Sequence, residues 1–322
     1  MKRRIGILTS GGDCPGLNAA IRGVTRAAYE LFDAEIVGIH DGYRGLITGD
    51  YQEMKRSQFS GILTLGGTIL GTARTPFRDM RKIGEDNVDK VAAMKKTYKD
   101  LKLDCLVTLG GNGTHKTANL LSKEGLNVIG LPKTIDNDLY GTDFTFGFHT
   151  AMDIATEVID RIHTTAGSHS RVMCIEIMGN KAGWLTLYSG IAGGADIILL
   201  PERPFDENVF LEKVAQLEKD RHNVIIAASE GVKNKDGVFL CDLVSTAGQL
   251  DAFGHKAILS GTSRYLADLI HVRLGCKTRA IEFSTLQRCA SHLASRTDIT
   301  EAYQVGGASV EAAYRGETGK MC

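Results

Sequence analysis

The chain has 322 residues, with 38 Lys and Arg against 38 Asp and Glu, and 43% of its residues are hydrophobic. Chains of this length and composition are typically globular and form more than one domain, so we expect two. The balanced charge excludes a basic surface built for nucleic acid, and no charge-free stretch reaches the about 20 apolar residues of a membrane span.

Short runs rich in β-branched and aliphatic residues alternate along the chain with segments of helical periodicity. The predicted strands cover residues 5–8, 35–39, 105–109, 128–131, 171–177, 196–200 and 224–228. The predicted helices cover residues 18–31, 88–101, 150–163, 208–219 and 261–274. This alternation predicts an α/β protein with two doubly wound lobes and largely parallel sheets.

A glycine-rich turn follows the first predicted strand. Residues 9–16 read Thr-Ser-Gly-Gly-Asp-Cys-Pro-Gly and precede a helix predicted to begin near Asn18. Glycines let the backbone approach a ligand closely, and a helix N-terminus offers free N–H groups, so the turn can bind an anion. A tight structural turn, with Pro15 near the helix start, is the alternative.

A second turn, Gly-Gly-Asn-Gly-Thr at residues 110–114, lies between a buried strand and a helix predicted to begin near His115. It is neither a P-loop, because the Lys-Ser/Thr ending is missing, nor a Gly-x-Gly-x-x-Gly dinucleotide turn. Two such anion sites in one chain favour a nucleotide ligand over a plain structural turn.

The third turn, residues 132–138, reads Pro-Lys-Thr-Ile-Asp-Asn-Asp. In an extended segment Asp136 and Asp138 point the same way and can share one site. One carboxylate can accept a proton from an attacking hydroxyl while the other holds a metal or positions the base. Lys133 and Thr134 add a cation and a hydroxyl suited to phosphate. A solvated acidic loop is the alternative.

These three turns, together with residues 66–74, the Met-Gly pair at 178–179 and the Gln-Arg pair at 287–288, resemble the phosphofructokinase family. The resemblance is to the bacterial form, which includes ATP-using and pyrophosphate-using members, and it covers essentially the whole chain. The Thr-Ile-Asp-Asn-Asp string at 134–138 is its most specific part, since lipid and NAD kinases share the Gly-Gly-x-Gly-Thr turn but lack this string.

The resemblance implies a phosphofructokinase-like fold with the active site in the cleft between two lobes. It assigns residues 1–147 and 287–318 to a larger, donor-binding lobe and residues 148–286 to a smaller, sugar-phosphate-binding lobe. Relatives continue beyond the position of Cys322, so we expect a longer native chain, whose missing strand would leave a sheet edge of the smaller lobe unpaired.

The activity implied is that of a glycolytic phosphotransferase, which converts fructose 6-phosphate to fructose 1,6-bisphosphate with ATP as co-substrate and Mg²⁺ as cofactor. The seven cysteines form no Cys-x-x-Cys pair, which fits reduced thiols and a cytoplasmic location. Asp136 matches the base that takes the sugar hydroxyl proton, Asp138 lies beside it, and Thr134 matches a ligand of the transferred phosphoryl group. Arg74 would neutralise transition-state charge, although an arginine alone is more often in a surface salt bridge.

The remaining family matches divide into a donor side and a sugar side. The donor side contains Gly12, Tyr43, Arg74, Gly111, Asn112, Gly113 and Thr114. The sugar side contains Arg171, Met178, Gly179, Glu230, Arg279 and Arg288. In the family the arginines matching Arg171 and Arg279 come from a neighbouring subunit, which implies a homotetramer or a homodimer.

Several positions depart from the family pattern. Asn112 stands where a carboxylate usually helps to hold magnesium, Asn180 replaces an arginine, and Thr285 replaces a sugar-phosphate histidine for which His292 is the nearest substitute. The bacterial effector site is matched in part, by Arg22, Arg26, Arg56, Lys219 and Arg221, whereas His163 replaces an arginine there. The segment 231–277 is extended, and residues 251–255 within it resemble the longer, mixed-donor members.

The identity of the phosphoryl donor depends on Gly113 and Lys133. Pyrophosphate-using relatives carry aspartate at the first position, where it would crowd and repel the α-phosphate of ATP, and lysine at the second. We favour ATP because Gly113 leaves room for it, and a diphosphate-dependent fructose-6-phosphate 1-phosphotransferase is the alternative. A nicotinamide oxidoreductase lacks support because its fingerprint is missing. Asp136 and Asp138 argue against a catalytically silent regulatory subunit.

Overall fold

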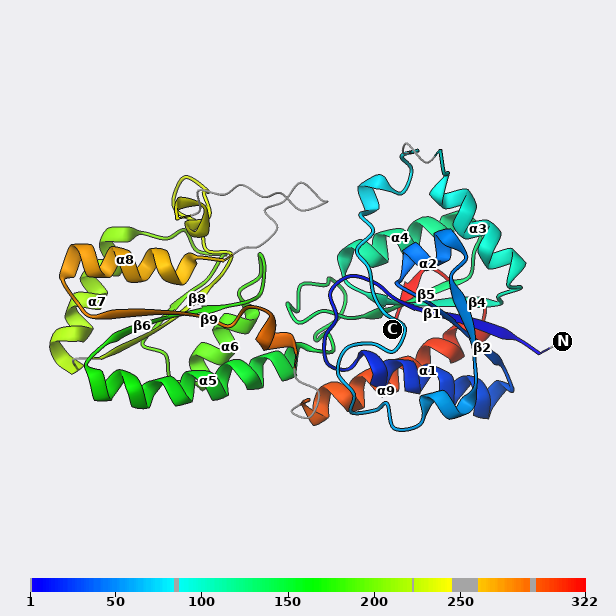
Figure 1. Cartoon of the computed structure of the whole chain (residues 1–322), viewed down its shortest axis with the longest axis horizontal. Helices are drawn as coiled ribbons and strands as arrows, with labels where there is room; N and C mark the ends of the chain where they lie inside the picture. The colour runs from blue at the N-terminus through cyan, green and yellow to red at the C-terminus, as the bar shows by residue number, and fades with distance from the viewer. Residues whose placement is uncertain (1, 84–86, 222, 245–259, 290–293) are drawn as a thin grey trace. The chain divides into compact units, whose positions relative to one another are not determined.

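The computed structural model describes residues 2–83, 87–221, 223–244, 260–289 and 294–322 (Figure 1). Contacts divide the chain into two compact units. The first consists of Met1–Thr134, Asp138–His149 and Arg288–Cys322, and the second of Ile135–Asn137 and Thr150–Gln287. The lobe limits expected from the sequence differ from these at four places. Residues 135–137 and 287 group with the second unit, and residues 148–149 and 319–322 group with the first.

The first unit is built on a six-stranded sheet with strand order β10-β5-β4-β1-β2-β3. Its strands are β1 (Arg4–Thr9), β2 (Glu35–Ile39), β3 (Tyr51–Met54), β4 (Cys105–Gly110), β5 (Val128–Pro132) and β10 (Lys320–Met321). All pairings are parallel except that of β3 with β2, which is antiparallel. The central strands β1 and β4 are almost entirely buried, as their continuous apolar runs predict.

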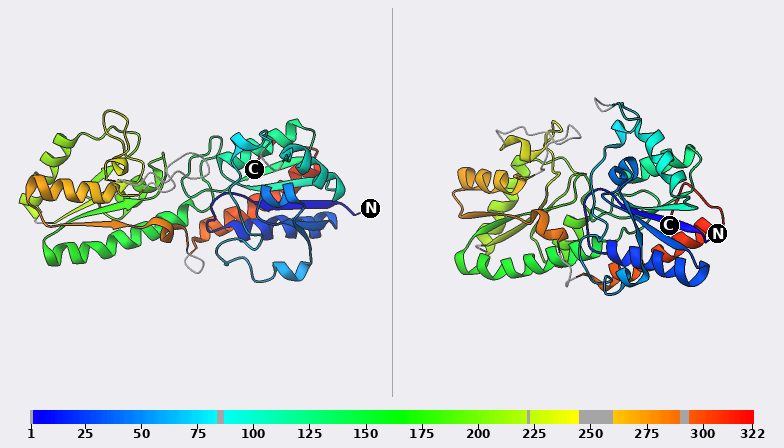
Figure 2. Two further views of the ribbon diagram at one scale, coloured as in Figure 1. Left: turned by 45° about the horizontal axis from the view of Figure 1, so that its top comes forward. Right: turned by 45° about the vertical axis from the view of Figure 1, so that its right-hand side comes forward.

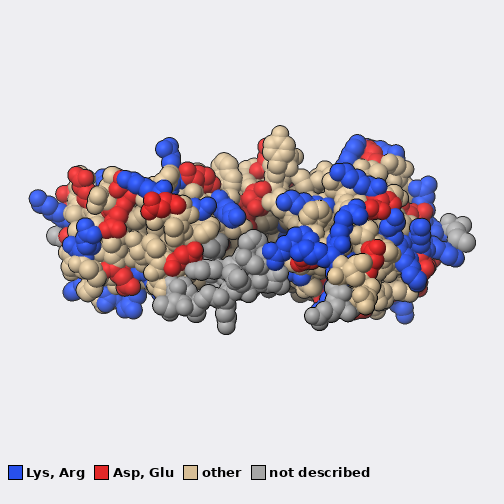
Figure 3. Space-filling view, turned by 90° about the horizontal axis from the view of Figure 1, so that it is seen from above, with Lys and Arg blue, Asp and Glu red and all other residues tan. Residues whose placement is uncertain are grey.

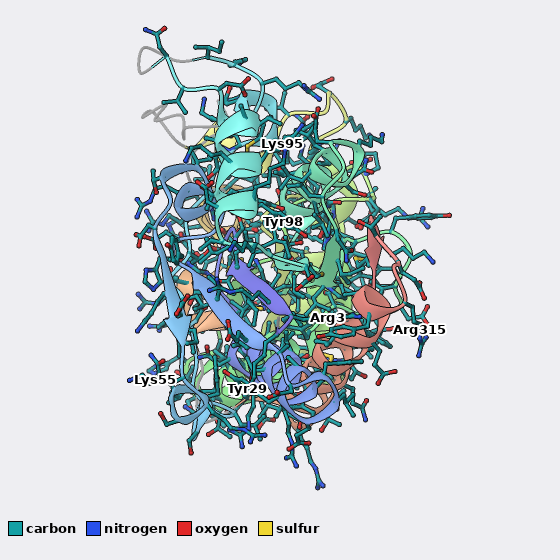
Figure 4. All side chains as sticks on the ribbon, turned by 90° about the vertical axis from the view of Figure 1, so that its right-hand side faces the viewer. Arg3, Tyr29, Lys55, Lys95, Tyr98 and Arg315 are labelled. Carbon is teal, nitrogen blue, oxygen red and sulfur yellow. The ribbon has the colours of Figure 1, made fainter. Side chains whose placement is uncertain are left out.

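Helices cover both faces of this sheet (Figures 1 and 2). One face carries α1 (Leu17–Phe32) and α9 (Arg296–Tyr314), which pack against each other. The other face carries α2 (Tyr43–Thr48), α3 (Lys90–Asp100) and α4 (Asn112–Lys123). Figure 4 looks onto α3, on which Tyr98 is buried and Lys95 binds Glu124 at 2.9 Å.

The second unit has a four-stranded parallel sheet with strand order β7-β8-β6-β9. Its strands are β6 (Val172–Ile177), β7 (Ile197–Leu199), β8 (Val224–Ser229) and β9 (Thr278–Glu282). Its helices are α5 (Phe148–His169), α6 (Trp184–Ala192), α7 (Glu207–Arg221) and α8 (Thr262–Leu274). In Figure 1, α7 and α8 cover one face of the sheet, and α5 and α6 lie on the other.

Short 3₁₀ helices complete the described chain: η1 (Arg56–Phe59), η2 (Phe77–Asp79), η3 (Leu240–Leu243) and η4 (Ser284–Arg288). No helix within the described ranges is long and apolar enough to cross a membrane. On the face drawn in Figure 3, both units present Lys and Arg side chains interspersed with Asp and Glu.

The α/β class with mostly parallel sheets is confirmed, and three local expectations are wrong. Helix α4 begins at Asn112 rather than near His115, so most of the second glycine turn is helical. Strand β10 pairs with β5 in the first unit, so the sheet edge at the end of the chain does not belong to the smaller lobe. The segment between Asp136 and Asp138 is not regularly extended, because Asn137 has a φ of 52°.

Candidate active site

The first glycine turn is held beside the segment that carries Arg74. The backbone N–H of Gly11 donates to the carbonyl of Ala73 at 3.3 Å, and the Thr72 hydroxyl donates to the carbonyl of Gly11 at 2.7 Å. Further back, the side chain of Asn18 binds backbone groups of residues 65, 66 and 69. The first glycine turn and the segment of residues 66–74, about 60 residues apart in the sequence, therefore lie side by side and are joined by hydrogen bonds.

Two cations lie at the glycine pair of this turn. A Cβ atom built on Gly12 would lie 3.8 Å from Nη2 of Arg74, and one built on Gly11 would lie 3.6 Å from Nζ of Lys133. Lys133 is only 5% exposed, and its ammonium donates to the carbonyl of Gly12. A short backbone loop flanked by an arginine and a buried lysine has the charge and the access that a phosphate group needs.

The second glycine turn forms the first turn of α4 and packs closely on the first. A Cβ on Gly110 would lie 2.1 Å from Oγ1 of Thr114, so only glycine fits there. Thr114 donates through that hydroxyl to the carbonyl of Ser10 at 3.4 Å. The N-terminus of α4, with its free N–H groups and positive dipole end, thus lies next to the turn after β1.

Tyr43 forms a hydrogen bond to the first turn of α4. It is 1% exposed, and its hydroxyl donates to the carbonyl of Thr114 at 2.9 Å. Burial raises the pKa of its hydroxyl well above the ordinary value, so the group remains a neutral donor. The sequence places Tyr43 on the donor side, and in the structure its hydroxyl faces the protein backbone.

Asp138, in the third turn, contacts the N-terminus of α4. The Asn112 amide donates to the Asp138 carboxylate at 3.2 Å and to its carbonyl at 3.4 Å. Surrounding protein atoms raise the pKa of Asp138, while the Asn112 bond and the charge of Lys133 act in the opposite direction. The turn itself is held where the Thr145 hydroxyl donates to the carbonyl of Thr134 at 2.7 Å.

The second unit contains a separate candidate half-site at the carboxyl ends of β6 and β8. Oε1 of Glu230 accepts hydrogen bonds from the backbone N–H groups of Gly179 at 3.2 Å and Asn180 at 2.8 Å. The pKa of Glu230 is raised to about 7: burial is the largest cause, the two N–H bonds oppose it, and the charge of Asp136 adds to the rise. Carboxyl ends of parallel strands are the usual ligand position in such sheets.

Arg171 and Arg279 lie at the other end of the same strands, the amino end. Arg171 directly precedes β6, and Arg279 pairs in register with Met173, the second residue of β6. With a rise of about 3.3 Å per residue, both arginines are on the order of 15–20 Å or more from Met178 along the strands. Within one chain they do not reach the turn that Glu230 holds.

Arg288 belongs to the first unit, where its guanidinium binds the Asp13 carboxylate and donates to the Asp13 carbonyl at 3.3 Å. Asp13 is part of the first glycine turn, so the guanidinium of Arg288 contacts this turn. The structure therefore places Arg288, which the family resemblance assigns to the sugar side, next to the first glycine turn.

Two residues with clear structural roles were not predicted from the sequence. The carboxylate of Glu176, at the end of β6, accepts the backbone N–H groups of Gly261 at 3.1 Å and Ser263 at 2.9 Å at the start of α8. Burial raises its pKa. Gln287 binds the backbone of Met178 at 2.9 Å. The Gln-Arg motif signals the second of these, but nothing local in the sequence signals the first.

The effector residues expected in the first unit surround a cavity of about 250 Å³. Arg22, Arg26 and Arg56 line it together with Tyr29, which Figure 4 labels on α1 near Lys55. The remaining effector matches lie in the second unit. There Arg221 pairs with Asp196 at 2.6 Å, Lys219 lies in the last turn of α7, and the His163 ring contacts the carbonyl of Gly193 at 2.7 Å. His292 and residues 251–255 are outside the described residues.

The oxygen ligands in the first unit fit Mg²⁺ bound largely through a nucleotide. Mg²⁺ in phosphotransferases is typically held by one or two carboxylates plus substrate phosphates. The described residues contain no group of three or more His, Cys, Asp or Glu side chains able to hold a metal ion. Asp138, with the amide of Asn112 beside it, offers the hard oxygen atoms that such shared binding requires.

Comparison with known proteins decides the family. The Phosphofructokinase family model matches residues 4–313. The chain belongs to the phosphofructokinase family. It is 50% identical to an ATP-dependent 6-phosphofructokinase of Spirochaeta thermophila, over 99% of this chain and 86% of that protein.

Relatives that use the other donor also match this phosphofructokinase. It is 43% identical to a pyrophosphate–fructose 6-phosphate 1-phosphotransferase of Amycolatopsis methanolica, over 99% of this chain and 89% of that protein. Among solved structures, it resembles a pyrophosphate-dependent phosphofructokinase from Marinobacter aquaeolei with a TM-score of 0.81 and 25% identity, covering 98% of this chain and 77% of that one.

Proposed function

We propose that this phosphofructokinase is an ATP-dependent 6-phosphofructokinase of the cytoplasm, which transfers the γ-phosphoryl group of ATP to the 1-hydroxyl of fructose 6-phosphate. The observation that carries the proposal is the anion site of the first unit, where Arg74 and Lys133 flank the Gly11–Gly12 backbone next to the N-terminus of α4. The 50% identity to the Spirochaeta thermophila enzyme supports the same activity.

In this reaction the first unit binds the donor. The glycine turns and the N–H groups at the start of α4 accept phosphate oxygens, and Arg74 neutralises charge that develops on the transferred group. Thr134 binds the same phosphoryl group. Mg²⁺, held by Asp138 with Asn112 beside it, neutralises phosphate charge when bound.

The second unit binds the sugar phosphate. Asp136 accepts the proton of the 1-hydroxyl as that oxygen attacks, and Glu230 accepts hydrogen bonds from sugar hydroxyls. Asp136 is close enough to Glu230 for its charge to raise the pKa of Glu230. We assign Met178 and Gly179, which lie in the turn that Glu230 holds, to the same half-site.

The enzyme works as a homodimer or homotetramer with shared sites. Arg171 and Arg279 lie at the amino end of the β6–β9 sheet, whereas Glu230 follows the carboxyl end of β8. If these two arginines bind the sugar phosphate, they do so from the amino end of the sheet, and they must therefore serve the half-site of a second copy of the chain.

ATP is the proposed donor because Gly113 has open space around it. A Cβ built on this residue meets no atom within 4 Å, so nothing crowds the position where a nucleotide α-phosphate would lie. Lys133 is compatible with either donor. Pyrophosphate stays the alternative, since two relatives named pyrophosphate–fructose 6-phosphate 1-phosphotransferase are 43% and 42% identical to this chain.

A coupled assay with fructose 6-phosphate and, in turn, ATP, GTP and pyrophosphate tests the proposal. We expect kcat/KM to be highest with ATP and to require Mg²⁺. A higher value with pyrophosphate establishes the alternative donor, and no turnover with any donor refutes the activity.

A regulatory site for a phosphorylated effector is a second proposal, supported by the 250 Å³ cavity lined by three arginines. Arg26 also contacts Glu30 at 2.9 Å, and the guanidinium of Arg56 lies 5.3 Å from the centre of the Tyr29 ring. An anion that enters the cavity competes with these contacts. Isothermal titration with ADP and phosphoenolpyruvate, in the wild type and in Arg56→Ala, tests this site.

A further inference from the structure

The turn after β6 has an irregular backbone, with one internal hydrogen bond from the N–H of Ala182 to the carbonyl of Gly179 at 2.9 Å. Gly179 has a φ of 146° and Asn180 a φ of 52°, both in the region that most side chains avoid. A Cβ on Gly179 would lie 2.5 Å from the carbonyl oxygen of Ala182. A backbone in such conformations persists only when surrounding groups hold it.

Two side chains from the neighbouring strands hold this turn. Strand β6 lies between β8 and β9 in the sheet. Glu230, directly after β8, accepts the N–H groups of Gly179 and Asn180. Gln287, in η4 after β9, accepts the N–H of Met178 at 2.9 Å, so three successive backbone donors are bound from both sides.

The amide of Gln287 has a second partner. It is fully buried, and its Nε2 donates to the carbonyl of Ala151 in α5 at 3.4 Å. The side chain must therefore accept on one side and donate on the other at the same time. Glutamine does both at any pH, whereas a glutamic acid of the same length can donate only when it is protonated. Removal of its oxygen leaves the partly buried N–H of Met178 without this partner.

We propose that Gln287 is a positioning residue for sugar-phosphate binding: its amide fixes the turn of residues 178–180, and through it Glu230, in the geometry that receives the sugar. This inference rests on the proposed function, since it names a residue that prepares the sugar half-site.

The test compares Gln287→Met with the wild type and with Leu286→Ala as a matched control. Methionine keeps the size and removes both hydrogen bonds, whereas Leu286 is 77% exposed next to it. We expect Gln287→Met to raise the KM for fructose 6-phosphate about tenfold, as loss of one buried hydrogen bond does, and to change the KM for ATP less than about twofold. The control should leave both values unchanged.

A second variant, Gln287→Glu, gives a readout that a general loss of stability does not produce. A protonated carboxyl accepts from Met178 and donates to Ala151, but an ionised carboxylate only accepts and is repelled by the Ala151 carbonyl. The KM for fructose 6-phosphate, divided by the wild-type value at the same pH, should therefore rise from pH 6 to pH 9. This variant also keeps the inference testable if Gln287→Met does not fold.

Hydrogen exchange of the intact protein measures the turn without any catalysis. Peptides that include Met178 should exchange faster in Gln287→Met, while peptides from β1 and β4 keep the wild-type rate. An unchanged KM for fructose 6-phosphate together with unchanged exchange at residue 178 overturns the inference. If the wild type turns over no fructose 6-phosphate with ATP or pyrophosphate, the proposed function fails, and the exchange data still decide whether Gln287 holds the turn.

Discussion

Glu230→Gln should remove a pH dependence of sugar binding. With a pKa of about 7, about one Glu230 carboxyl in ten is ionised at pH 6 and about nine in ten at pH 8. Oε1 is engaged by the turn after β6, and Oε2 has no protein partner among the described residues, so it can accept from a sugar hydroxyl. If only the ionised form accepts well, the wild-type KM for fructose 6-phosphate should fall about tenfold from pH 6 to pH 8.

The assay is the KM for fructose 6-phosphate at saturating ATP from pH 6 to pH 8 in both proteins. The substrate phosphate also titrates in this range, and the ratio of the two KM values at each pH removes its effect. Glu202→Gln is the matched control, since this exposed carboxylate also binds a backbone N–H, that of Gly183 at 2.7 Å. A KM ratio that does not vary with pH refutes the role of Glu230 ionisation.

The same carboxyl should affect folding stability in the opposite direction. Its pKa is about 7 in the folded protein against an ordinary value of 4.5, so its contribution to stability is fully present below pH 4.5 and is lost as the pH rises through 7. The loss amounts to about 3 kcal/mol at 1.36 kcal/mol per pKa unit. The free energy of unfolding of Glu230→Gln, relative to the wild type, should therefore be higher at pH 8 than at pH 5 by a few kcal/mol.

Four further substitutions test the assignment of the two half-sites. Asp136→Asn should keep the fold and lower kcat about 10²- to 10⁴-fold, because an amide cannot accept the hydroxyl proton; a near-normal kcat at saturating substrates removes Asp136 as the base. Arg171→Ala and Arg279→Ala should each raise the KM for fructose 6-phosphate more than the KM for ATP, and an effect on ATP alone reverses the assignment. Gly113→Asp should fold normally, since its Cβ meets no atom within 4 Å, and should lower kcat/KM for ATP while leaving or revealing activity with pyrophosphate; a variant that still prefers ATP shows that this position does not set the donor.

Strands and helices could be predicted from the sequence wherever their buried residues follow a simple pattern. Central strands such as β4 are entirely buried and read as continuous apolar runs. Strand β3 was missed because three of its four residues are exposed and polar or aromatic, as fits an antiparallel edge strand. Helix α6 was missed because it carries no charged residue, so no amphipathic period marks it.

The site was predictable as separate motifs but not as an arrangement. In each turn taken by itself, the glycines, cations and carboxylates at the strand end indicate what kind of ligand the turn can bind. By contrast, Gln287 contacts Met178 across 109 residues, and Glu176 contacts Gly261 across 85. Such contacts depend on which strands become neighbours in the sheet, and no local pattern reports that order.

Left-handed asparagines connect the local sequence to the active-site geometry. Asn137 separates the two carboxylates of the third turn, and Asn180 follows Gly179 in the turn that Glu230 and Gln287 hold; each has a φ of 52°. Asparagine adopts this conformation more readily than other residues with a Cβ, because its short amide can bind the local backbone. The replacement of the family arginine by Asn180 therefore removes a charge from the sugar side but lowers the strain of the turn. At Asn137 the same conformation breaks the alternation of an extended strand, so the side chains of Asp136 and Asp138 need not share a face and can take different roles.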